Sequence, residues 1–227
     1  MSTMESKYVC IHYGFGDYVA CFGLIKELSK QHDIILFAIP HRSNLHIENI
    51  KRLYNSIKNV QISTDDPKSY SDVLYVGWDK FFDAAWLDPS INCIEYFYNQ
   101  VEVPLNLMWD NFYFERDMKK EKEIFDSLGL NEEYIFLHDD PVRGFVIDRK
   151  YIKPDTRIVH LIELGDISIL DILYVVEKAK EVHVYNTGLI PFIELMNINH
   201  PNLNYHKYIR PLPYEQPILK LNWNIIN

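Results

Sequence analysis

The sequence contains little of what builds disulfide scaffolds or membrane-spanning segments. It has only three cysteines in 227 residues, and none of them forms a CxxC pair. This spacing argues against a disulfide framework, so we expect reduced thiols in a cytoplasmic protein. The N-terminus lacks the apolar region of a signal peptide, and no apolar run approaches the roughly 20 residues that a membrane helix requires. No integral membrane segment is therefore predicted.

Positive charge is also scarce. The chain carries 23 Lys and Arg residues against 32 Asp and Glu residues, which gives a formal net charge of −9. A surface of this sign repels phosphate backbones, and the basic run at 118–122 is short and interrupted by Glu121. We therefore expect no nucleic-acid partner, although one arginine together with a helix N-terminus can still attract a nucleotide.

A complete dinucleotide-binding fingerprint is missing as well. Gly14 and Gly16 follow the first apolar run, but Val19 stands where the GxGxxG pattern has its third glycine. A nicotinamide cofactor is therefore not expected, and no cofactor is predicted. Further along, Asp139 and Asp140 are adjacent and lack the DxD spacing of metal-dependent sugar transferases, so no metal site is predicted.

The chain does contain a core-forming share of hydrophobic residues, 48%, and many aromatic residues, among them 16 Tyr and 12 Phe. Tyrosine suits a ligand site because it offers an apolar face and a hydroxyl. Buried apolar runs alternate with segments of helical spacing. Strands are predicted at 8–13, 33–40, 59–65, 71–78, 134–140, 157–164 and 181–186. Helices are predicted at 17–30, 44–57, 90–101, 119–130, 168–180 and 187–197.

This alternation predicts an α/β fold with parallel sheets. It occurs twice, and the segment 102–117 between the two series is irregular. We therefore expect two Rossmann-like lobes, 1–113 and 114–227, with a cleft between them. The proline-broken tail is a candidate for packing back on the N-terminal lobe. Ligands of such sheets bind beyond the carboxyl ends of the strands, and three polar clusters follow predicted strands.

The first cluster spans 12–19. Gly14 and Gly16 let the backbone bend and let a ligand approach closely. Asp17 lies where the next helix begins, and it has two interpretations. It caps the helix, or it is a general base that the helix dipole keeps ionised. The two roles do not exclude each other. His12 is a weaker candidate on the same side.

The second cluster is HDDPVRGF, 138–145. Arg143 suits bidentate binding of a phosphate. His138 and Asp139 are candidate donor contacts, and Asp139 or Asp140 suits sugar or ribose hydroxyls. The structural alternative is an Asp-Pro turn with a local Asp–Arg pair.

The third cluster is the run Asn186, Thr187 and Gly188 between a strand and a helix. Backbone N–H groups at such a helix start bind phosphate without a metal. The structural alternative is a turn in which Thr187 caps the helix. The segment 204–211, which includes Arg210, is interpreted as a structural strand or loop at the edge of the cleft.

The opening GFGDYVACFGLIKEL and the later NTGLIPFIEL resemble glycosyltransferases of the GT-B fold, in particular the heptosyltransferase-like branch. That branch opens with Gly-Asp after its first strand and carries an Asp-Thr-Gly-x-x-His turn in its second half. The blocks 97–117 and 134–148 look like glycosyltransferase-like proteins of polysaccharide gene neighbourhoods. The chain differs from the branch at Asn186, where the turn has Asp, and at Pro191, where it has His.

The resemblance implies a metal-independent, inverting hexosyl- or heptosyltransferase in polysaccharide or glycan synthesis. Asp17 matches the catalytic base, and Thr187 and Gly188 match the donor-phosphate turn. A nucleotide-sugar would bind mainly to the second lobe, and an acceptor hydroxyl would reach it from the first. Two other functions stay open. One is a hydrolase or epimerase acting on the nucleotide-sugar itself, and the other is a catalytically silent nucleotide-sugar-binding module.

Overall fold

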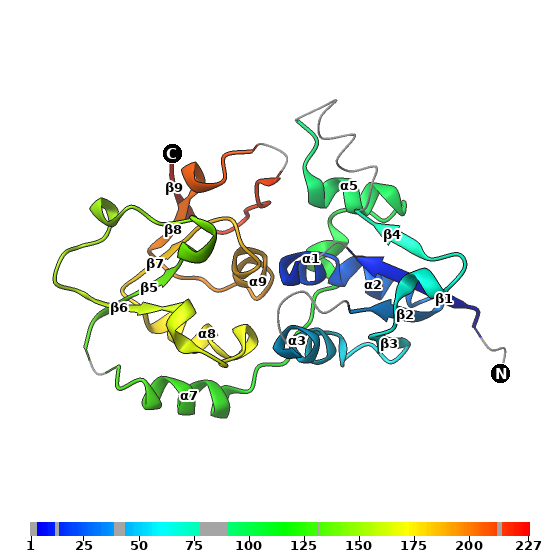
Figure 1. Ribbon diagram of the computed structural model, residues 1–227, viewed down its shortest axis with the longest axis horizontal. Helices are drawn as coiled ribbons and strands as arrows, with labels where there is room; N and C mark the ends of the chain where they lie inside the picture. Colours follow the sequence, from blue (N-terminus) through cyan, green and yellow to red (C-terminus); the bar gives the residue numbers. More distant parts are fainter. Residues whose placement is uncertain (1–3, 12–13, 39–43, 78–89, 131, 213–214) are drawn as a thin grey trace. The chain divides into compact units, whose positions relative to one another are not determined.

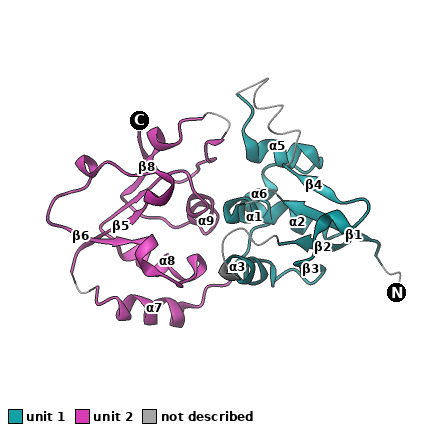
Figure 2. Ribbon diagram, viewed as in Figure 1, with its two compact units in different colours: residues 1–114 teal, residues 115–227 magenta. Residues whose placement is uncertain are grey.

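The structure is a computed structural model that describes residues 4–11, 14–38, 44–77, 90–130, 132–212 and 215–227 (Figure 1). It divides into two compact units, Met1–Phe114 and Glu115–Asn227 (Figure 2). The predicted boundary lies one residue before this division. Each unit is described by itself below, and the cleft between two lobes stays a prediction.

Unit 1 contains a four-stranded parallel sheet of order β3-β2-β1-β4. Its strands are β1 (Ser6–Ile11), β2 (Asp33–Phe37), β3 (Val60–Ser63) and β4 (Leu74–Val76). Its helices are α1 (Phe15–Ala20), α2 (Phe22–Leu28), α3 (Asn44–Tyr54), α5 (Cys93–Gln100) and α6 (Leu107–Asp110), with the 3₁₀ turn η1 (Pro67–Ser69). The strand order reverses between β1 and β4, which is where a Rossmann-type sheet binds its ligand. Asp17 lies in α1, the first described helix after β1.

The first predicted helix, 17–30, is in fact two helices that meet at Cys21. In one continuous helix the Leu24 N–H would donate to the Ala20 carbonyl. Here the Tyr98 hydroxyl lies between the two groups. It accepts from Leu24 N at 3.2 Å and donates to Ala20 O at 2.9 Å. A side chain inserted into the ladder is a known cause of helix breaks.

Close packing in unit 1 depends on Gly23. A Cβ placed on this residue would lie 2.0 Å from the carbonyl oxygen of Leu107 in α6. Only glycine lets α2 and α6 approach to this distance. The pair therefore links the start of unit 1 to its last helix.

Unit 2 contains a five-stranded parallel sheet of order β6-β5-β7-β8-β9. Its strands are β5 (Tyr134–His138), β6 (Arg157–His160), β7 (Glu181–Val184), β8 (Leu203–His206) and β9 (Trp223–Ile226). Its helices are α7 (Met118–Ser127), α8 (Leu173–Lys178) and α9 (Leu189–Leu195), with 3₁₀ turns η2 (Pro141–Arg143), η3 (Arg149–Tyr151), η4 (Leu161–Leu164), η5 (Ile169–Asp171) and η6 (Lys207–Ile209). Counted from β5, the order is the flavodoxin-like 2-1-3-4-5, whose ligand lies at the switch between β5 and β7.

The two faces of the unit 2 sheet are covered differently. Side chains alternate along β5. Tyr134 donates its hydroxyl to Val175 O of α8 on one face. Ile135 and Leu137 point to the other face and pack on Ile147. The second and third polar clusters follow β5 and β7, so they lie at the switch point of this sheet.

The C-terminal tail forms a strand that the sequence analysis did not predict. Trp223–Ile226 pairs with β8 as the last strand of the unit 2 sheet. The buried Glu194 carboxylate of α9 accepts hydrogen bonds from Lys220 N, Leu221 N and Trp223 Nε1. This carboxylate explains why the tail, a candidate for packing on the first lobe, joins the second sheet.

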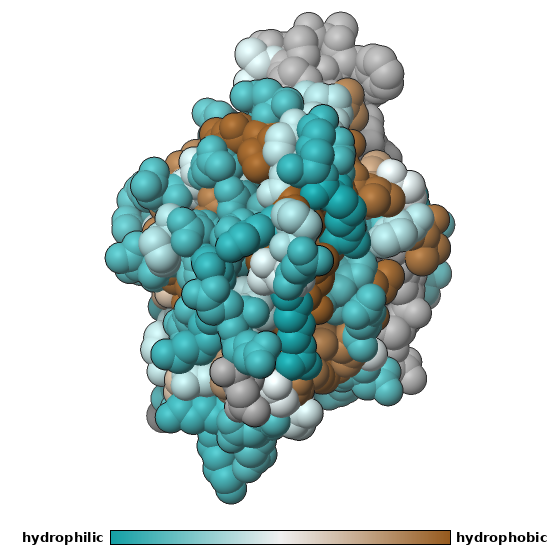
Figure 3. Space-filling model, turned by 90° about the vertical axis from the view of Figure 1, so that its left-hand side faces the viewer, coloured by the Kyte–Doolittle hydropathy of each residue, from teal (hydrophilic) through white to brown (hydrophobic). Residues whose placement is uncertain are grey.

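The outer surface is mainly polar on the face that Figure 3 displays, with hydrophobic side chains in separate patches. Across the described ranges, no helix combines the length and the apolar character that crossing a bilayer demands. All three cysteines lie in the described ranges and none forms a disulfide, and Cys10 and Cys21 are buried.

Candidate functional site

Asp17 is the third residue of α1, and Gly14 is the residue that caps the helix. The Gly14 N–H donates to Asp17 Oδ2 at 2.8 Å. This is the reciprocal half of a capping box, in which a side chain reaches back to the chain before the helix. The structural interpretation of Asp17 is therefore observed, although at a different helix position than predicted. The side chain is only partly buried. Its role as a general base stays a prediction.

The glycines beside Asp17 are not required by backbone conformation. Gly14 has an extended backbone with φ −90° and ψ 149°, which any residue adopts. A Cβ at Gly14 would lie 3.2 Å from Asp17 Oδ2, so the glycine leaves room for the carboxylate. Gly16 is the second residue of α1. His12 lies outside the described residues.

Arg143 lies in a tight turn at the carboxyl end of β5. Asp140 accepts hydrogen bonds from both Arg143 N at 3.1 Å and Arg143 Nε at 2.5 Å. The predicted Asp-Pro turn with a local Asp–Arg pair is therefore present. Burial, the largest single influence, lowers the pKa of Arg143, but the hydrogen bonds and charges of Asp140 and Tyr185 together outweigh burial and raise that pKa. Arg143 Nη2 also donates to Tyr185 Oη at 2.9 Å, which joins the ends of β5 and β7.

A second arginine, Arg210, follows β8 and extends to the same ends of β5 and β7. Arg210 Nη2 donates to Glu215 Oε2 at 2.5 Å, and its Nη1 donates to Asn186 O at 3.4 Å. The guanidinium carbons of Arg210 and Arg143 lie 5.6 Å and 5.2 Å from the ring centroid of Phe145. The structure thus brings Arg143 and Asn186 of the second and third clusters together.

The sequence pattern does not predict Phe145 or Tyr185 as site residues, and it favours a structural role for Arg210. Phe145 and Tyr185 resembled ordinary core aromatics. Arg210 lies 67 residues after Arg143, so no local spacing connects them. The available signal was Tyr185 itself, a tyrosine at the end of a predicted strand next to Asn186.

Asp139, next to Asp140 in the chain, is almost fully buried. Its Oδ2 accepts from Ile147 N at 3.0 Å, and its Oδ1 lies 2.6 Å from His160 Nε2, without the alignment of a hydrogen bond. The carboxylate therefore joins the loop after β5 to the end of β6. Direct contact of Asp139 with a donor stays a prediction.

His138 ends β5 next to these groups. Burial lowers its pKa to about 4, with a further contribution from the positive charge of His160. The imidazole is therefore neutral near pH 7. Its Nδ1 is buried and has no hydrogen-bond partner in the part of the chain that the structure describes. The ring centroids of His138 and Tyr185 are 5.8 Å apart.

The Asn-Thr-Gly turn after β7 is present, but Gly188 rather than the predicted Thr187 is the residue at the N-cap of α9. The Thr187 hydroxyl accepts from Leu189 N at 3.3 Å, at the start of α9. Asn186 Nδ2 donates to Glu215 O at 2.5 Å. Gly188 has ordinary helical angles, φ −60° and ψ −14°. Binding of a donor phosphate by this turn stays a prediction.

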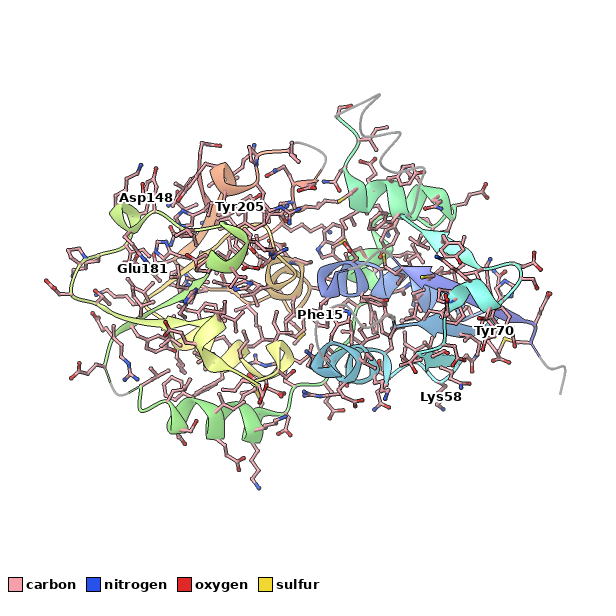
Figure 4. The ribbon with its side chains drawn as sticks, viewed as in Figure 1. Phe15, Lys58, Tyr70, Asp148, Glu181 and Tyr205 are labelled. Carbon is pink, nitrogen blue, oxygen red and sulfur yellow. The ribbon has the colours of Figure 1, made fainter. Side chains whose placement is uncertain are left out.

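A separate histidine cluster lies in β7 and β8. His183 Nε2 is 3.0 Å from Glu181 Oε2, and His183 Nδ1 is 2.9 Å from His206 Nε2. An ionised Glu181 accepts from His183 Nε2, so His206 Nε2 donates to His183 Nδ1. Burial lowers the pKa of His206 to about 4, and His183 lowers it further. Figure 4 labels Glu181, with Asp148 and Tyr205 in the same unit.

No cluster of three or more His, Cys, Asp or Glu side chains within the described ranges is arranged to hold a metal ion. The polar groups gathered at the β5–β7 switch point include two arginine side chains, a tyrosine hydroxyl and a neutral imidazole.

Comparison with known proteins gives one informative likeness. No family profile matches the sequence, and no curated protein matches it. The chain is similar in structure to a glycosyl transferase family 9 protein from Veillonella parvula, with a TM-score of 0.54 and 9% sequence identity. The alignment covers 100% of this chain and 88% of that one. At this identity the likeness shows the fold alone, an α/β architecture with two parallel sheets, as the sequence predicts.

Proposed function

We propose that this chain is a glycosyltransferase that moves a sugar from a nucleotide-sugar to an acceptor hydroxyl. The observation that supports this most is the likeness to a glycosyl transferase over the whole chain. The arginine pair at the switch point of unit 2 adds to it, because that is where such sheets bind ligands. We assign the donor diphosphate to unit 2, beside Arg143 and the Thr187–Gly188 turn.

The proposed reaction is metal-independent and inverting. The acceptor hydroxyl attacks the anomeric carbon, Asp17 takes the hydroxyl proton, and the bond from the anomeric carbon to the diphosphate oxygen breaks with its electron pair leaving on that oxygen. Negative charge develops on the departing diphosphate, so a guanidinium such as Arg143 stabilises the transition state more than the ground state. We further propose a role in polysaccharide or glycan synthesis, which the sequence resemblance motivates.

A catalytically silent binding module is the second candidate. It is favoured by one observation: the predicted reacting and donor-binding groups Asp17, Asp139 and Asn186 all make hydrogen bonds within their own units. The two functions differ in turnover, because a silent module binds a nucleotide-sugar without releasing a nucleoside diphosphate.

The test is a panel of UDP, GDP, ADP, CMP and dTDP sugars, each incubated with the protein, chelator and a mixture of glycan acceptors. Mass spectrometry then detects glycosylated product, free sugar and released nucleotide. Glycosylated product supports the proposal. Free sugar formed without acceptor indicates a hydrolase, and binding without any turnover indicates the silent module.

Asp17→Asn tests the proposed base. An amide oxygen still accepts the Gly14 N–H, so the helix cap is kept while the proton acceptor is lost. We expect transfer to fall by about 10²–10⁴-fold and donor affinity to stay unchanged. Asp66→Asn is the matched control, because Asp66 also caps a short helix in unit 1, by accepting from Lys68 N. Unchanged transfer by Asp17→Asn would show that Asp17 is only a cap.

A further inference from the structure

Two guanidinium groups meet the same aromatic ring in unit 2, and each is already paired with a carboxylate. Arg143 pairs with Asp140 and Arg210 pairs with Glu215, both at 2.5 Å. The arginine side chains stay 40% and 29% exposed. The site is therefore a pair of cations that the protein neutralises internally, and an incoming anion can reach both of them.

The two carboxylates differ in what else they do. Asp140 also accepts from the backbone N–H of Arg143, so its departure would open the turn after β5. The side chain of Glu215 has Arg210 as its one hydrogen-bond partner among the described residues. Breaking the Glu215–Arg210 ion pair therefore destabilises the fold less than breaking the Asp140–Arg143 pair would.

The backbone around Arg210 is held independently of the Glu215 side chain. Gln216 Nε2 donates to Arg210 O and to Leu212 O, both at 2.8 Å, and Tyr205 Oη donates to Gln216 Oε1 at 2.6 Å. The Asn186 amide holds the backbone carbonyl of Glu215. Exchange of the carboxylate for another anion thus leaves the position of Arg210 fixed.

Donors also remain for such an anion. Arg143 Nη1 and Arg210 Nε have no hydrogen-bond partner within the described ranges. A phosphate presents oxygens in the bidentate geometry of a carboxylate, so it can replace Glu215 on the guanidinium fork. Because two guanidinium groups lie beside one aromatic ring, each can bind one of two linked phosphates. A diphosphate therefore fits this pair better than a single phosphate does.

We propose that Arg210 is a second phosphate-binding arm of this site, and that Glu215 is an internal competitor which a diphosphate displaces. The proposal rests on the proposed function in identifying the diphosphate as that of the donor. The exchange itself needs no transfer reaction, because it breaks and forms only hydrogen bonds and ion pairs.

The experiment is calorimetric titration of the full chain with inorganic pyrophosphate. Glu215→Gln removes the competing charge but keeps the side-chain shape, and we expect pyrophosphate to bind about tenfold more tightly. Arg210→Gln is expected to weaken binding about tenfold or more. Glu133→Gln is the matched control, since it removes the same charge from an exposed ion pair with Lys180 elsewhere in unit 2. It should change the affinity less than twofold.

Several results would overturn the proposal. These are no pyrophosphate binding to the wild-type chain, binding that Arg210→Gln leaves unchanged, and binding that Glu215→Gln weakens or leaves unchanged. Circular dichroism of each variant confirms folding, and Arg210→Lys, which keeps the charge without the fork, serves if Arg210→Gln unfolds. Pyrophosphate exchange without sugar transfer would reject the proposed function alone. Sugar transfer that is insensitive to Arg210 would reject this inference alone.

Discussion

The two units have similar parallel sheets but differ in what they bury. Among the described residues of unit 1, the buried polar side chains are those of Ser29 and Asn49, beside several tyrosines. Unit 2 buries acids and histidines instead. They are Glu121, Asp139, His160, Asp171, His183, Glu194, His200 and His206.

The two units therefore use different side chains as hydrogen-bond partners for buried backbone N–H and C=O groups. Unit 1 uses neutral hydroxyls, such as Tyr98 between α1 and α2 and Tyr54 on Tyr18 O. Unit 2 uses charged groups, such as Glu194 on the β9 segment. Buried charges are strongly destabilising when one partner is removed, whereas a lost neutral hydrogen bond costs less. Unit 2 should therefore respond more to mutation of a polar group and to pH.

The largest expected effect is that of Glu121→Ala in unit 2. The buried carboxylate accepts from Arg116 Nε at 2.8 Å and from Tyr174 N at 2.7 Å, so its loss leaves a cation and a helix start without this partner. We expect unit 2 to lose about 3–5 kcal/mol of stability. Hydrogen exchange of peptides from α7 and α8 measures this.

Glu123→Ala on the same helix is the control. Glu123 is 65% exposed and lies 3.8 Å from Lys119, so its loss should change stability by less than about 1 kcal/mol. If both variants have the same small effect, the buried acids of unit 2 do not carry its stability and the comparison fails.

Acidification should destabilise unit 2 selectively. The folded-state pKa of His206 is about 4, below its ordinary value of 6.5, so the unfolded chain binds more protons between those two values. The contribution of His206 to the stability of unit 2 is fully present above pH 6.5, and it is lost as the pH falls towards 4. From pH 7 to pH 5 the loss from His206 alone is about 2 kcal/mol.

Urea unfolding at pH 7, 6 and 5, followed by hydrogen exchange of β7 and β8, checks this expectation. His206→Phe removes the titrating group from its contacts with His183, Tyr151 and Tyr208. It should make the pH dependence shallower. An unchanged slope would assign the pH response to other groups, among them His138 and His183, whose pKa values burial also lowers.

The smallest effect is expected in unit 1. Tyr98→Phe removes the hydroxyl between Leu24 N and Ala20 O, but these two groups can then bond to each other. We expect a loss of about 1 kcal/mol, with faster hydrogen exchange in 15–28. Tyr70→Phe is the control, because its hydroxyl bonds the exposed Asp65. A loss as large as that of Glu121→Ala would remove the contrast between the units.

Most of the fold was predictable because its signals are local. The strands and helices follow from apolar runs and helical spacing, and the predicted division at 113 and 114 is one residue from the observed one. The break at Cys21 was not predictable, since it depends on a hydroxyl 74 residues beyond Leu24. Strand β9 was missed because three prolines lie between β8 and β9 and because its anchor, Glu194, lies in another element.

The candidate site was predictable only in part for a similar reason. Arg143 and Asn186 could be singled out because both lie in short polar segments after strands. Their meeting with Arg210 on the Phe145 ring depends on the order in which β5, β7 and β8 lie side by side. The sequence contains that order only indirectly, through the packing of the whole unit.

The Tyr98 hydroxyl also has a consequence for synthesis on the ribosome. Residues 15–28 leave the exit tunnel long before Tyr98 is translated. Until then Leu24 N has Ala20 O as its helical partner, so we expect a nascent chain to form one unbroken helix here. The break at Cys21 is completed only when α5 docks. A fragment that ends before residue 98 lacks the Tyr98 hydroxyl that causes the break.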